Sequence, residues 1–295
     1  MRYVGRFAPS PTGKLHQGSL AAALASCLEA RTHGGRWLLR IDDLDSARVI
    51  PGMADEHKRT LAACGFEWDG PVMVQSQRRE AYAAAIDVLR GRGLVYECSC
   101  SRRQLEAASD EPAYPGTCRQ GPTGPGPTAL RLRVDDAAVE SWEDAWQGHC
   151  EYALARLGDV VVRRRDGVYA YQLAVIVDDA AQGVTHVVRG ADLLESTPWQ
   201  RALQRGLGLP LLEYAHLPLI SEPSGRKLAK SRRSVPVDAG AGAVCDALQL
   251  LRQEPPPALA RADATEVWDW ARVHWRPERL RGVASVPALQ QIQNG

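Results

Sequence analysis

The sequence predicts an α/β fold in which crossover helices cover a parallel sheet. Three observations carry this expectation. Strand-like and helix-like segments alternate over the first hundred residues, the alternation breaks in a turn-rich stretch that holds three cysteines, and it resumes after residue 158. Such alternation is typical of βαβ units, whose strands are parallel. The interrupting stretch is therefore expected to be an insertion on the main fold.

In the first part of the chain, apolar runs predict strands at 3–8 and 37–41. An alanine-rich segment predicts a helix at 19–31, which ends before a pair of glycines, a common helix stop. Helical patterns follow at 53–64 and 77–90. Each strand is thus followed by a helix, as a parallel sheet requires.

After the interruption, strands are expected at 160–165 and 185–189, with helices at 171–181 and 193–204. A basic loop comes next, and the remainder of the chain is expected to be helical. Within that remainder, four apolar residues share one helical face and predict a packing stripe: Val267, Trp268, Ala271 and Trp275.

Composition limits the classes of protein to consider. Hydrophobic residues make up 45% and charged residues 24% of the 295 residues, which is typical of a soluble globular protein. The net charge is +1, so an RNA partner would need a local basic patch. The N-terminus has no apolar leader, and no apolar run approaches the roughly 20 residues of a membrane span. A cytoplasmic protein without a membrane partner is expected.

The loop around His16, Gly18 and Ser19 lies where a strand is followed by a helix. Ligands of parallel α/β sheets bind at this edge, and the unpaired N–H groups of a helix N-terminus suit phosphate. A histidine at a helix start is more often a cap or a packing residue, so this short motif alone is weak. The basic loop that precedes the C-terminal part holds Lys227, Lys230 and Ser231. Two lysines three residues apart can contact a triphosphate, although a solvated basic loop is the simpler interpretation.

Together, the two motifs resemble the HIGH and KMSKS signatures of class I aminoacyl-tRNA synthetases. The strings RFAPSPTG at 6–13 and LLRIDDLD at 38–45 are similar to glutamyl-tRNA synthetase, and the resemblance covers about the first 235 residues. Only 64 residues follow Ser231 (295 − 231), so no anticodon-binding domain is expected. This shortness and the cysteine cluster resemble the glutamyl-Q tRNA(Asp) synthetase family.

The resemblance implies a Rossmann-like parallel sheet of the class I synthetase type. It implies a split nucleotide-binding catalytic domain at 1–95 and 159–220, a zinc-containing insertion of the acceptor-binding type at 96–158, and the KMSKS-like loop with a helical subdomain at 221–295. It also implies that the enzyme activates glutamate with ATP and Mg²⁺ without tRNA, and then transfers it to the queuosine base in the anticodon of tRNA(Asp). A monomer is expected.

Site residues follow from the positions that match the motifs. The resemblance assigns His16 and Lys230 to catalysis, and it assigns ATP binding to Pro9, His16, Gly18, Ser19, Lys227, Lys230 and Ser231. Glutamate binding is assigned to Arg6, Ala8, Ser10, Asp42, Tyr171 and Arg189. Guanidinium groups suit the two carboxylates of glutamate. Asp42 stands where the family usually has glutamate to receive the substrate ammonium, so its side chain is one methylene shorter.

Cys98, Cys100 and Cys118 predict a zinc site, because a C-x-C pair in a loop-rich segment seldom arises from core packing. Three thiolates leave a tetrahedral ion one ligand short. On spacing alone a histidine or a fourth cysteine is expected, the nearest being the distant His149 and Cys150. The family resemblance instead implies Tyr114 as the fourth ligand of one structural zinc ion.

Two alternatives remain at this stage. A glutamyl-tRNA synthetase core would charge a tRNA 3′ end and would need tRNA for activation. A nucleotidyltransferase of the related HxGH type would use similar motifs, but it gives no reason for Arg6, Tyr171 and Arg189 together or for the cysteine cluster. A non-catalytic RNA-binding relic is disfavoured because His16 and Lys230 are both retained.

Overall fold

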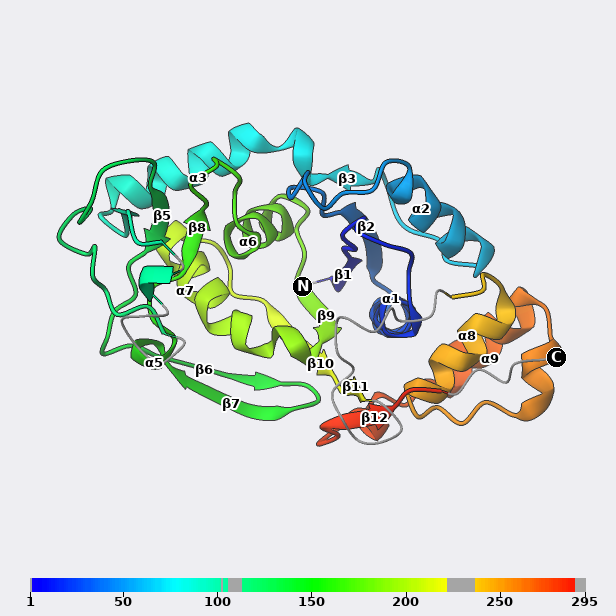
Figure 1. Ribbon diagram of the computed structural model, residues 1–295. Helices are drawn as coiled ribbons and strands as arrows, with labels where there is room; N and C mark the ends of the chain where they lie inside the picture. Colours follow the sequence, from blue (N-terminus) through cyan, green and yellow to red (C-terminus); the bar gives the residue numbers. More distant parts are fainter. Residues whose placement is uncertain (1, 102, 106–112, 222–236, 290–295) are drawn as a thin grey trace.

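The structure is a computed structural model that describes residues 2–101, 103–105, 113–221 and 237–289. Its centre is a parallel arrangement of strands (Figure 1). One three-stranded sheet has the order β1-β2-β3 and a second sheet has the order β7-β6-β10-β9. The bounds of these strands are β1 Val4–Phe7, β2 Arg36–Ile41, β3 Met73–Val74, β6 Val139–Asp144, β7 Gly148–Ala153, β9 His186–Gly190 and β10 Glu213–Leu217.

The two sheets meet between β1 and β9. The Thr185 N–H donates to Val4 O (2.9 Å), and Thr185 Oγ1 accepts from Val4 N–H (2.9 Å). Within these two sheets, paired strands are parallel except β6 and β7, which form an antiparallel hairpin. The chain leaves β1 toward β2 and β3 on one side and returns through β9 and β10 on the other. Ligands of open α/β sheets bind at such a switch point, beyond the carboxyl ends of the strands.

Helices cover both faces of this arrangement. α1 packs against β1, β2 and β9, whereas α6 on the opposite face contacts α3, α7 and the side chains of β1 and β2. The predicted strands and helices of both halves are confirmed within a few residues, although the segment expected to be a helix from Leu193 begins as a 3-10 helix. The helical bounds are α1 Gln17–Thr32, α2 Met53–Ala63, η1 Gln75–Gln77, α3 Arg79–Gly91, α5 Leu154–Leu157, α6 Tyr171–Ala181, η2 Ala191–Ser196 and α7 Thr197–Leu207.

A separate antiparallel sheet has the order β4-β5-β8, with bounds Val95–Cys98, Ala129–Leu132 and Val161–Arg163. It carries the cysteine-containing segment and lies apart from the end of the molecule that holds α8 and α9 (Figure 1). The predicted insertion at 96–158 stays a prediction. The sheets do not respect these predicted bounds. β6 lies inside them but joins the parallel sheet beside β10, whereas β8 lies outside them but belongs to the small antiparallel sheet.

The C-terminal part contains α8 Ala241–Leu250, η3 Pro257–Arg261, α9 Ala264–His274 and η4 Pro277–Leu280. The expected packing stripe on α9 is confirmed, because its four residues are at most 5% exposed. The expectation that this whole remainder is helical is wrong at one place. β12, Ser285–Pro287, pairs in parallel with β11, Leu219–Ser221, because a short extended segment can complete an edge without any helical periodicity.

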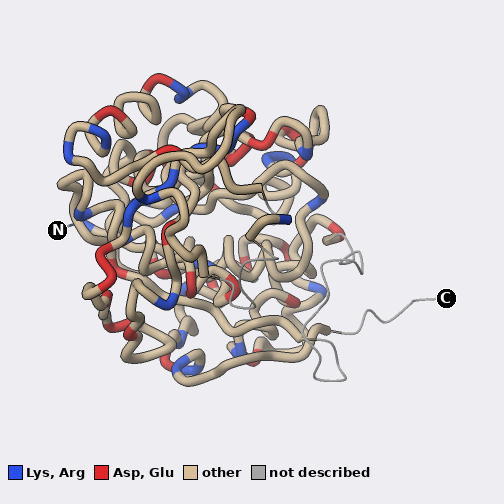
Figure 2. The backbone as a smooth tube through the Cα atoms, turned by 60° about the vertical axis from the view of Figure 1, so that its left-hand side comes forward, with Lys and Arg blue, Asp and Glu red and all other residues tan. Residues whose placement is uncertain are grey.

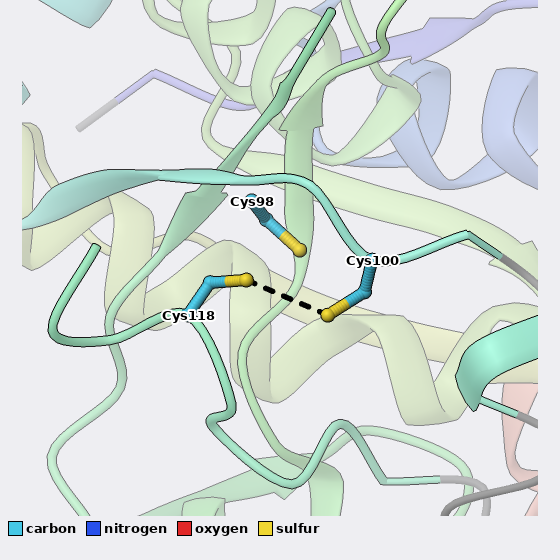
Figure 3. A group of neighbouring side chains, drawn as sticks. All are labelled: Cys98, Cys100 and Cys118. Carbon is cyan, nitrogen blue, oxygen red and sulfur yellow. Dashed lines mark hydrogen bonds between the residues drawn. The ribbon is translucent and has the colours of Figure 1, made fainter. Parts of the chain in front are cut away.

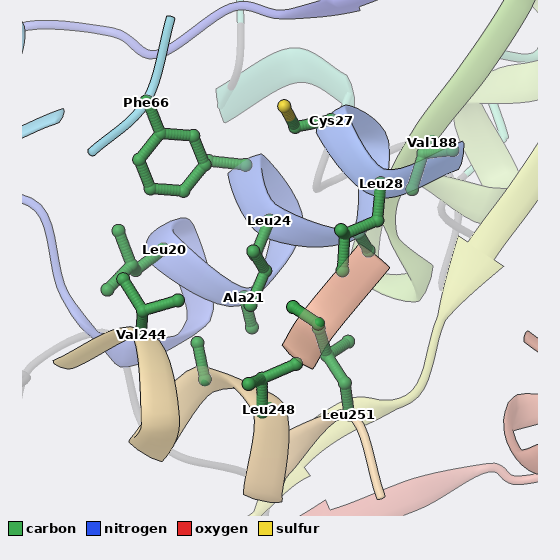
Figure 4. Close-up of a cluster of buried hydrophobic side chains, with 14 of the residues drawn as sticks. Leu20, Ala21, Leu24, Cys27, Leu28, Phe66, Val188, Val244, Leu248 and Leu251 are labelled. Carbon is green, nitrogen blue, oxygen red and sulfur yellow. The ribbon is translucent and has the colours of Figure 1, made fainter. Parts of the chain in front are cut away.

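The main core surrounds α1, which is buried on nearly every side (Figure 4). Its alanines permit close approach, so the sheet packs on one side and α8 on the other. Leu24 and Leu28 are fully buried, and Val244 and Leu248 of α8 complete the contact. This packing fixes the N-terminal end of α1, where the first sequence motif lies.

Basic and acidic segments are interspersed over the backbone (Figure 2), as a net charge of +1 leads one to expect. Among the described residues, no helix is both long enough and apolar enough to cross a membrane.

Candidate functional site

His16 is the N-cap residue of α1. Its Nδ1 accepts a hydrogen bond from the Ser19 N–H (3.2 Å), which satisfies one of the unpaired donors at the helix start. Because Nδ1 is the acceptor, the neutral ring carries its proton on Nε2. The surrounding protein lowers the pKa of His16 by desolvation, partly opposed by Asp192, so the ring is neutral at pH 7. The outer Nε2–H has no hydrogen-bond partner in the part of the chain that the structure describes, so it can donate to a ligand.

Gly18 leaves room that a larger residue would fill. A Cβ at this position would lie 3.1 Å from Ile220 Cδ1 and 3.2 Å from His16 Cε1. The absence of that atom avoids close contacts with Ile220 and His16 beside the first turn of α1. Pro9, in the same loop, is buried, and its carbonyl accepts from the Asp42 N–H (3.0 Å). The loops after β1 and β2 are thus joined.

A buried charge network lies beneath these loops. Asp179 of α6 accepts from Arg40 Nη1 at 2.6 Å and from Arg6 Nε at 3.3 Å, while Arg40 Nε donates to Asp42 at 2.8 Å. The four side chains are at most 7% exposed, and their formal charges cancel. Burial raises the pKa of Asp42 despite its contact with Arg40. Burial also acts to raise the pKa of Asp179, but Arg6 and Arg40 outweigh it and hold that pKa below its ordinary value.

Arg6 uses only its Nε in this network. Its two terminal nitrogens have no hydrogen-bond partner among the described residues, although the residue is only 4% exposed. Asp179 thus fixes the base of the guanidinium group and leaves its planar fork available. Such a fork suits a carboxylate.

Arg189, at the end of β9, is 5% exposed and is enclosed by neutral acceptors. No carboxylate of the described residues contacts its guanidinium group. The five contacts are Nε to His216 Nε2 at 3.0 Å, Nη1 to Tyr171 Oη at 3.2 Å and to Gln200 Oε1 at 2.8 Å, and Nη2 to Thr197 Oγ1 at 2.8 Å and to Leu193 O at 3.4 Å. A buried cation without a direct counter-charge favours an anionic ligand.

The two arginines lie near one another because β1 and β9 are neighbours. The pKa of Tyr214 on β10 depends on both arginines. Burial raises this pKa, and the positive charges of Arg189 and Arg6 oppose the rise. Arg189 lies 5.3 Å from the Tyr214 ring centroid. The carboxyl ends of two adjacent parallel strands therefore present two guanidinium groups to one region.

The structure describes only some of the remaining predicted site residues. Ala8 is half-buried and Ser10 is exposed in the loop after β1. Lys227, Lys230 and Ser231 lie outside the described residues. The chain on either side of them contacts the first motif, since Ile220 lies against Gly18 and the Val237 N–H donates to Leu15 O (3.0 Å).

The three predicted cysteine ligands converge, with their sulfur atoms within 4.8 Å of one another (Figure 3). Cys100 Sγ and Cys118 Sγ are 3.5 Å apart, and Tyr114 Oη lies 3.4 Å from Cys98 Sγ and 3.5 Å from Cys100 Sγ. A tetrahedral zinc ion with bonds of about 2.3 Å to sulfur and about 2.0 Å to oxygen places sulfurs roughly 3.8 Å apart and an oxygen roughly 3.5 Å from each sulfur. The four atoms therefore fit a metal ion.

Surrounding residues hold this cluster in place. Gly158 has φ +67°, and a Cβ there would lie 2.6 Å from the Tyr114 backbone nitrogen, so only glycine permits this close approach. The Arg131 guanidinium group lies 3.8 Å from the Tyr114 ring centroid, a cation–π contact that helps to hold the ring in place. The two distant candidate ligands lie elsewhere. Cys150 packs beside Trp142 in a different cluster, and His149 Nδ1 contacts Glu143 Oε1 on the β6–β7 hairpin.

The comparisons with known proteins decide the family. Residues 3–249 match the family described as tRNA synthetases class I (E and Q), catalytic domain. A glutamyl-Q tRNA(Asp) synthetase of Dechloromonas aromatica is 53% identical over 92% of this chain and 94% of its own length. One of Pseudomonas aeruginosa is 50% identical over 97% of both chains. The chain belongs to the glutamyl-Q tRNA(Asp) synthetase family.

Membership makes the protein a ligase of the class I tRNA synthetase type, as the sequence predicted. The fold agrees. A glutamate tRNA ligase of Elizabethkingia meningosepticum, solved in complex with its amino acid, superposes with a TM-score of 0.81 at 24% identity. The match covers 98% of this chain and 67% of that one.

Three residues of the site were missed by sequence reasoning. Asp179 contacts Arg6, and the pair Asp144 and His216 lies behind Arg189. These residues are far apart in the sequence and become neighbours only through strand pairing and helix packing. The adjacent acidic residues at 178–179, late on an apolar helix, were the one local signal, since buried carboxylates need partners.

Proposed function

We propose that this family member activates glutamate with ATP, without tRNA, and transfers the glutamyl group to the queuosine base in the anticodon of tRNA(Asp). The names of its relatives support the acceptor. The observation that carries the amino-acid specificity is the pair of buried guanidinium groups at adjacent strand ends, Arg6 and Arg189. Glutamate offers two carboxylates: Arg6 has two unpaired terminal nitrogens for one, and Arg189 would receive the other by exchanging its neutral contacts for the substrate.

The described contacts suggest how the substrate is held. Arg6 offers its unpaired terminal nitrogens to one carboxylate, and Arg189 with the Tyr171 hydroxyl takes the other. The second oxygen of Asp42, the one not bonded to Arg40, is proposed to meet the substrate ammonium. Ala8 and Ser10 are proposed to line the same loop. Neutral glutamine would offer a guanidinium group one acceptor oxygen and a donating NH₂ in place of two charged oxygens, which favours glutamate.

ATP is proposed to bind over the start of α1. Pro9, Gly18 and Ser19 are proposed to contact the nucleotide, and His16 would donate its Nε2–H to a phosphate oxygen. The substrate carboxylate attacks the α-phosphorus, the bond to the bridging oxygen breaks, and pyrophosphate leaves. His16 and Lys230 stabilise the charge that develops there, with Lys227 and Ser231 contacting ATP. Mg²⁺ bound with ATP would neutralise phosphate charge.

We further propose that one zinc ion is held by Cys98, Cys100, Cys118 and Tyr114. Its role is structural, because it ties the strand end at Cys98 to the loop at Cys118. The predicted division into a split catalytic domain, a zinc-containing insertion and a C-terminal subdomain is part of this proposal, as are the monomeric state and the cytoplasmic location.

The test of the acceptor uses labelled glutamate and purified protein with four RNAs: tRNA(Asp) with queuosine, tRNA(Asp) without it, tRNA(Glu), and none. Label is expected on queuosine-containing tRNA(Asp) alone, and after ribonuclease cleavage it should lie on the anticodon fragment and not on the 3′-terminal fragment. Label on the 3′ end of tRNA(Glu) would instead establish the glutamyl-tRNA synthetase alternative.

A further inference from the structure

Arg189 is one member of a buried chain of three side chains. Strand register places His216 of β10 directly beside Arg189 of β9, and Asp144 ends the neighbouring β6. Arg189 Nε donates to His216 Nε2 at 3.0 Å, and His216 Nδ1 lies 2.5 Å from Asp144 Oδ2. His216 and Asp144 have fully buried side chains.

The donors and acceptors of this chain allow a single arrangement of protons. The Arg189 Nε–H can only donate, so His216 Nε2 must be unprotonated. The ring proton then lies on Nδ1 and is donated to the Asp144 carboxylate. Burial lowers the pKa of His216, which keeps the ring neutral between a cation and an anion.

The two oxygens of Asp144 have separate tasks. Oδ1 accepts from the backbone N–H groups of Trp146, Gln147 and His216, at 3.0–3.1 Å, and so shapes the turn after β6. Oδ2 contacts the His216 ring. The turn and the ring contact can therefore be altered independently.

We propose that Asp144 and His216 are positioning residues that fix the orientation of the Arg189 guanidinium group for the substrate carboxylate. This inference deepens the proposed function and depends on the role assigned there to Arg189. Asp144 supplies a counter-charge at one remove. The arginine is thereby oriented and its charge is balanced at a distance, yet no carboxylate of the described residues contacts its guanidinium group.

The first test is a pair of substitutions at one position. In His216→Gln, the side-chain amide lies near the place of Nε2 and can still accept from Arg189. In His216→Asn, the amide lies near the place of Nδ1, so it can still donate to Asp144 but cannot reach Arg189. In ATP–pyrophosphate exchange, His216→Asn is expected to raise the KM for glutamate roughly 10- to 100-fold. His216→Gln should raise it less than about threefold, with kcat and the ATP KM nearly unchanged in both. A similar KM in the two variants, or a larger rise in His216→Gln, would overturn the proposal.

The second test reads the proton directly and needs no activity. In Asp144→Asn, the amide oxygen can keep the Oδ1 contacts, while its NH₂ no longer accepts the ring proton, so Nδ1 and Nε2 both face donors and the preference for one tautomer is weakened. Nitrogen NMR of ¹⁵N-histidine-labelled protein should show His216 protonated on Nδ1 in the wild type and a larger share of the Nε2-protonated form in Asp144→Asn. A wild-type ring protonated on Nε2 would refute the arrangement even if glutamate were not the substrate. Asp159→Asn, a buried carboxylate beside Arg119 away from this site, serves as the control for loss of a buried charge.

Discussion

Arg6 and Arg40 both contact the carboxylate of Asp179. Substituting each arginine in turn therefore distinguishes a binding role of Arg6 from a purely structural one. In Arg6→Met, Asp179 keeps Arg40 at 2.6 Å and is not left unpaired. The free energy of unfolding should fall by only about 1 kcal/mol, a change in Tm of about 2–4 °C. Glutamate, however, would lose charge-assisted hydrogen bonds worth about 1.5–3 kcal/mol, so its KM should rise about 10- to 150-fold.

Arg40→Met is the matched comparison. Removing the Arg40 guanidinium group breaks its 2.8 Å contact with Asp42 and its 2.6 Å contact with Asp179, and both carboxylates are almost fully buried. Breaking such pairs typically costs about 3–5 kcal/mol, so this variant should lose stability far more than Arg6→Met. The assays are thermal unfolding and glutamate-dependent ATP–pyrophosphate exchange at varied glutamate. Arg6→Met with a normal glutamate KM, or with a loss of Tm equal to that of Arg40→Met, would refute the reasoning.

Further outcomes follow from other parts of the structure. Asparagine is also a good N-cap residue, so His16→Asn should keep the helix start and the Tm while lowering the exchange kcat roughly 100-fold; an unchanged kcat would exclude a phosphate contact. Metal analysis of the purified protein should find one zinc ion per chain. Cys118→Ala should lose this ion and Cys150→Ala should keep it; zinc retained in Cys118→Ala would contradict the proposed ligands. Burial lowers the pKa of His57 and His216, so the unfolded chain binds protons below about pH 6.5 that the folded chain does not. Stability should therefore decrease as the pH is lowered below about 6.5; urea unfolding of His57→Asn should show a smaller loss, and an equal loss would count against this origin.

Much of the fold could be predicted because its local patterns are strong. The helix at 171–181 and the strand at 185–189 have clear apolar periods, and the structure contains them as α6 and β9. The β6 strand was missed because its pattern is inverted. Its buried positions are Glu140, Trp142 and Asp144, whereas Val139 is 54% exposed. Carboxylates face inward there because Arg201 and His216 receive them.

The candidate site divides in the same way. Arg6 and His16 lie on motifs that the sequence displays, and the family resemblance assigns Arg189, so all three could be proposed before the structure was known. The partners that orient two of them could not. Asp179 reaches Arg6 across 173 residues and His216 reaches Asp144 across 72. Such pairs depend on strand order and register, which no local pattern encodes. The fourth ligand position was likewise open from spacing, since tyrosine is an unusual metal ligand.

Glutamate-dependent ATP–pyrophosphate exchange in the complete absence of tRNA tests the central claim most directly. Wild-type protein with ATP and Mg²⁺ should exchange label with glutamate and far less with glutamine. Exchange that appears only when tRNA is added would contradict tRNA-independent activation and favour a glutamyl-tRNA synthetase core. No exchange with any amino acid would contradict the whole assignment of Arg6 and Arg189 to glutamate.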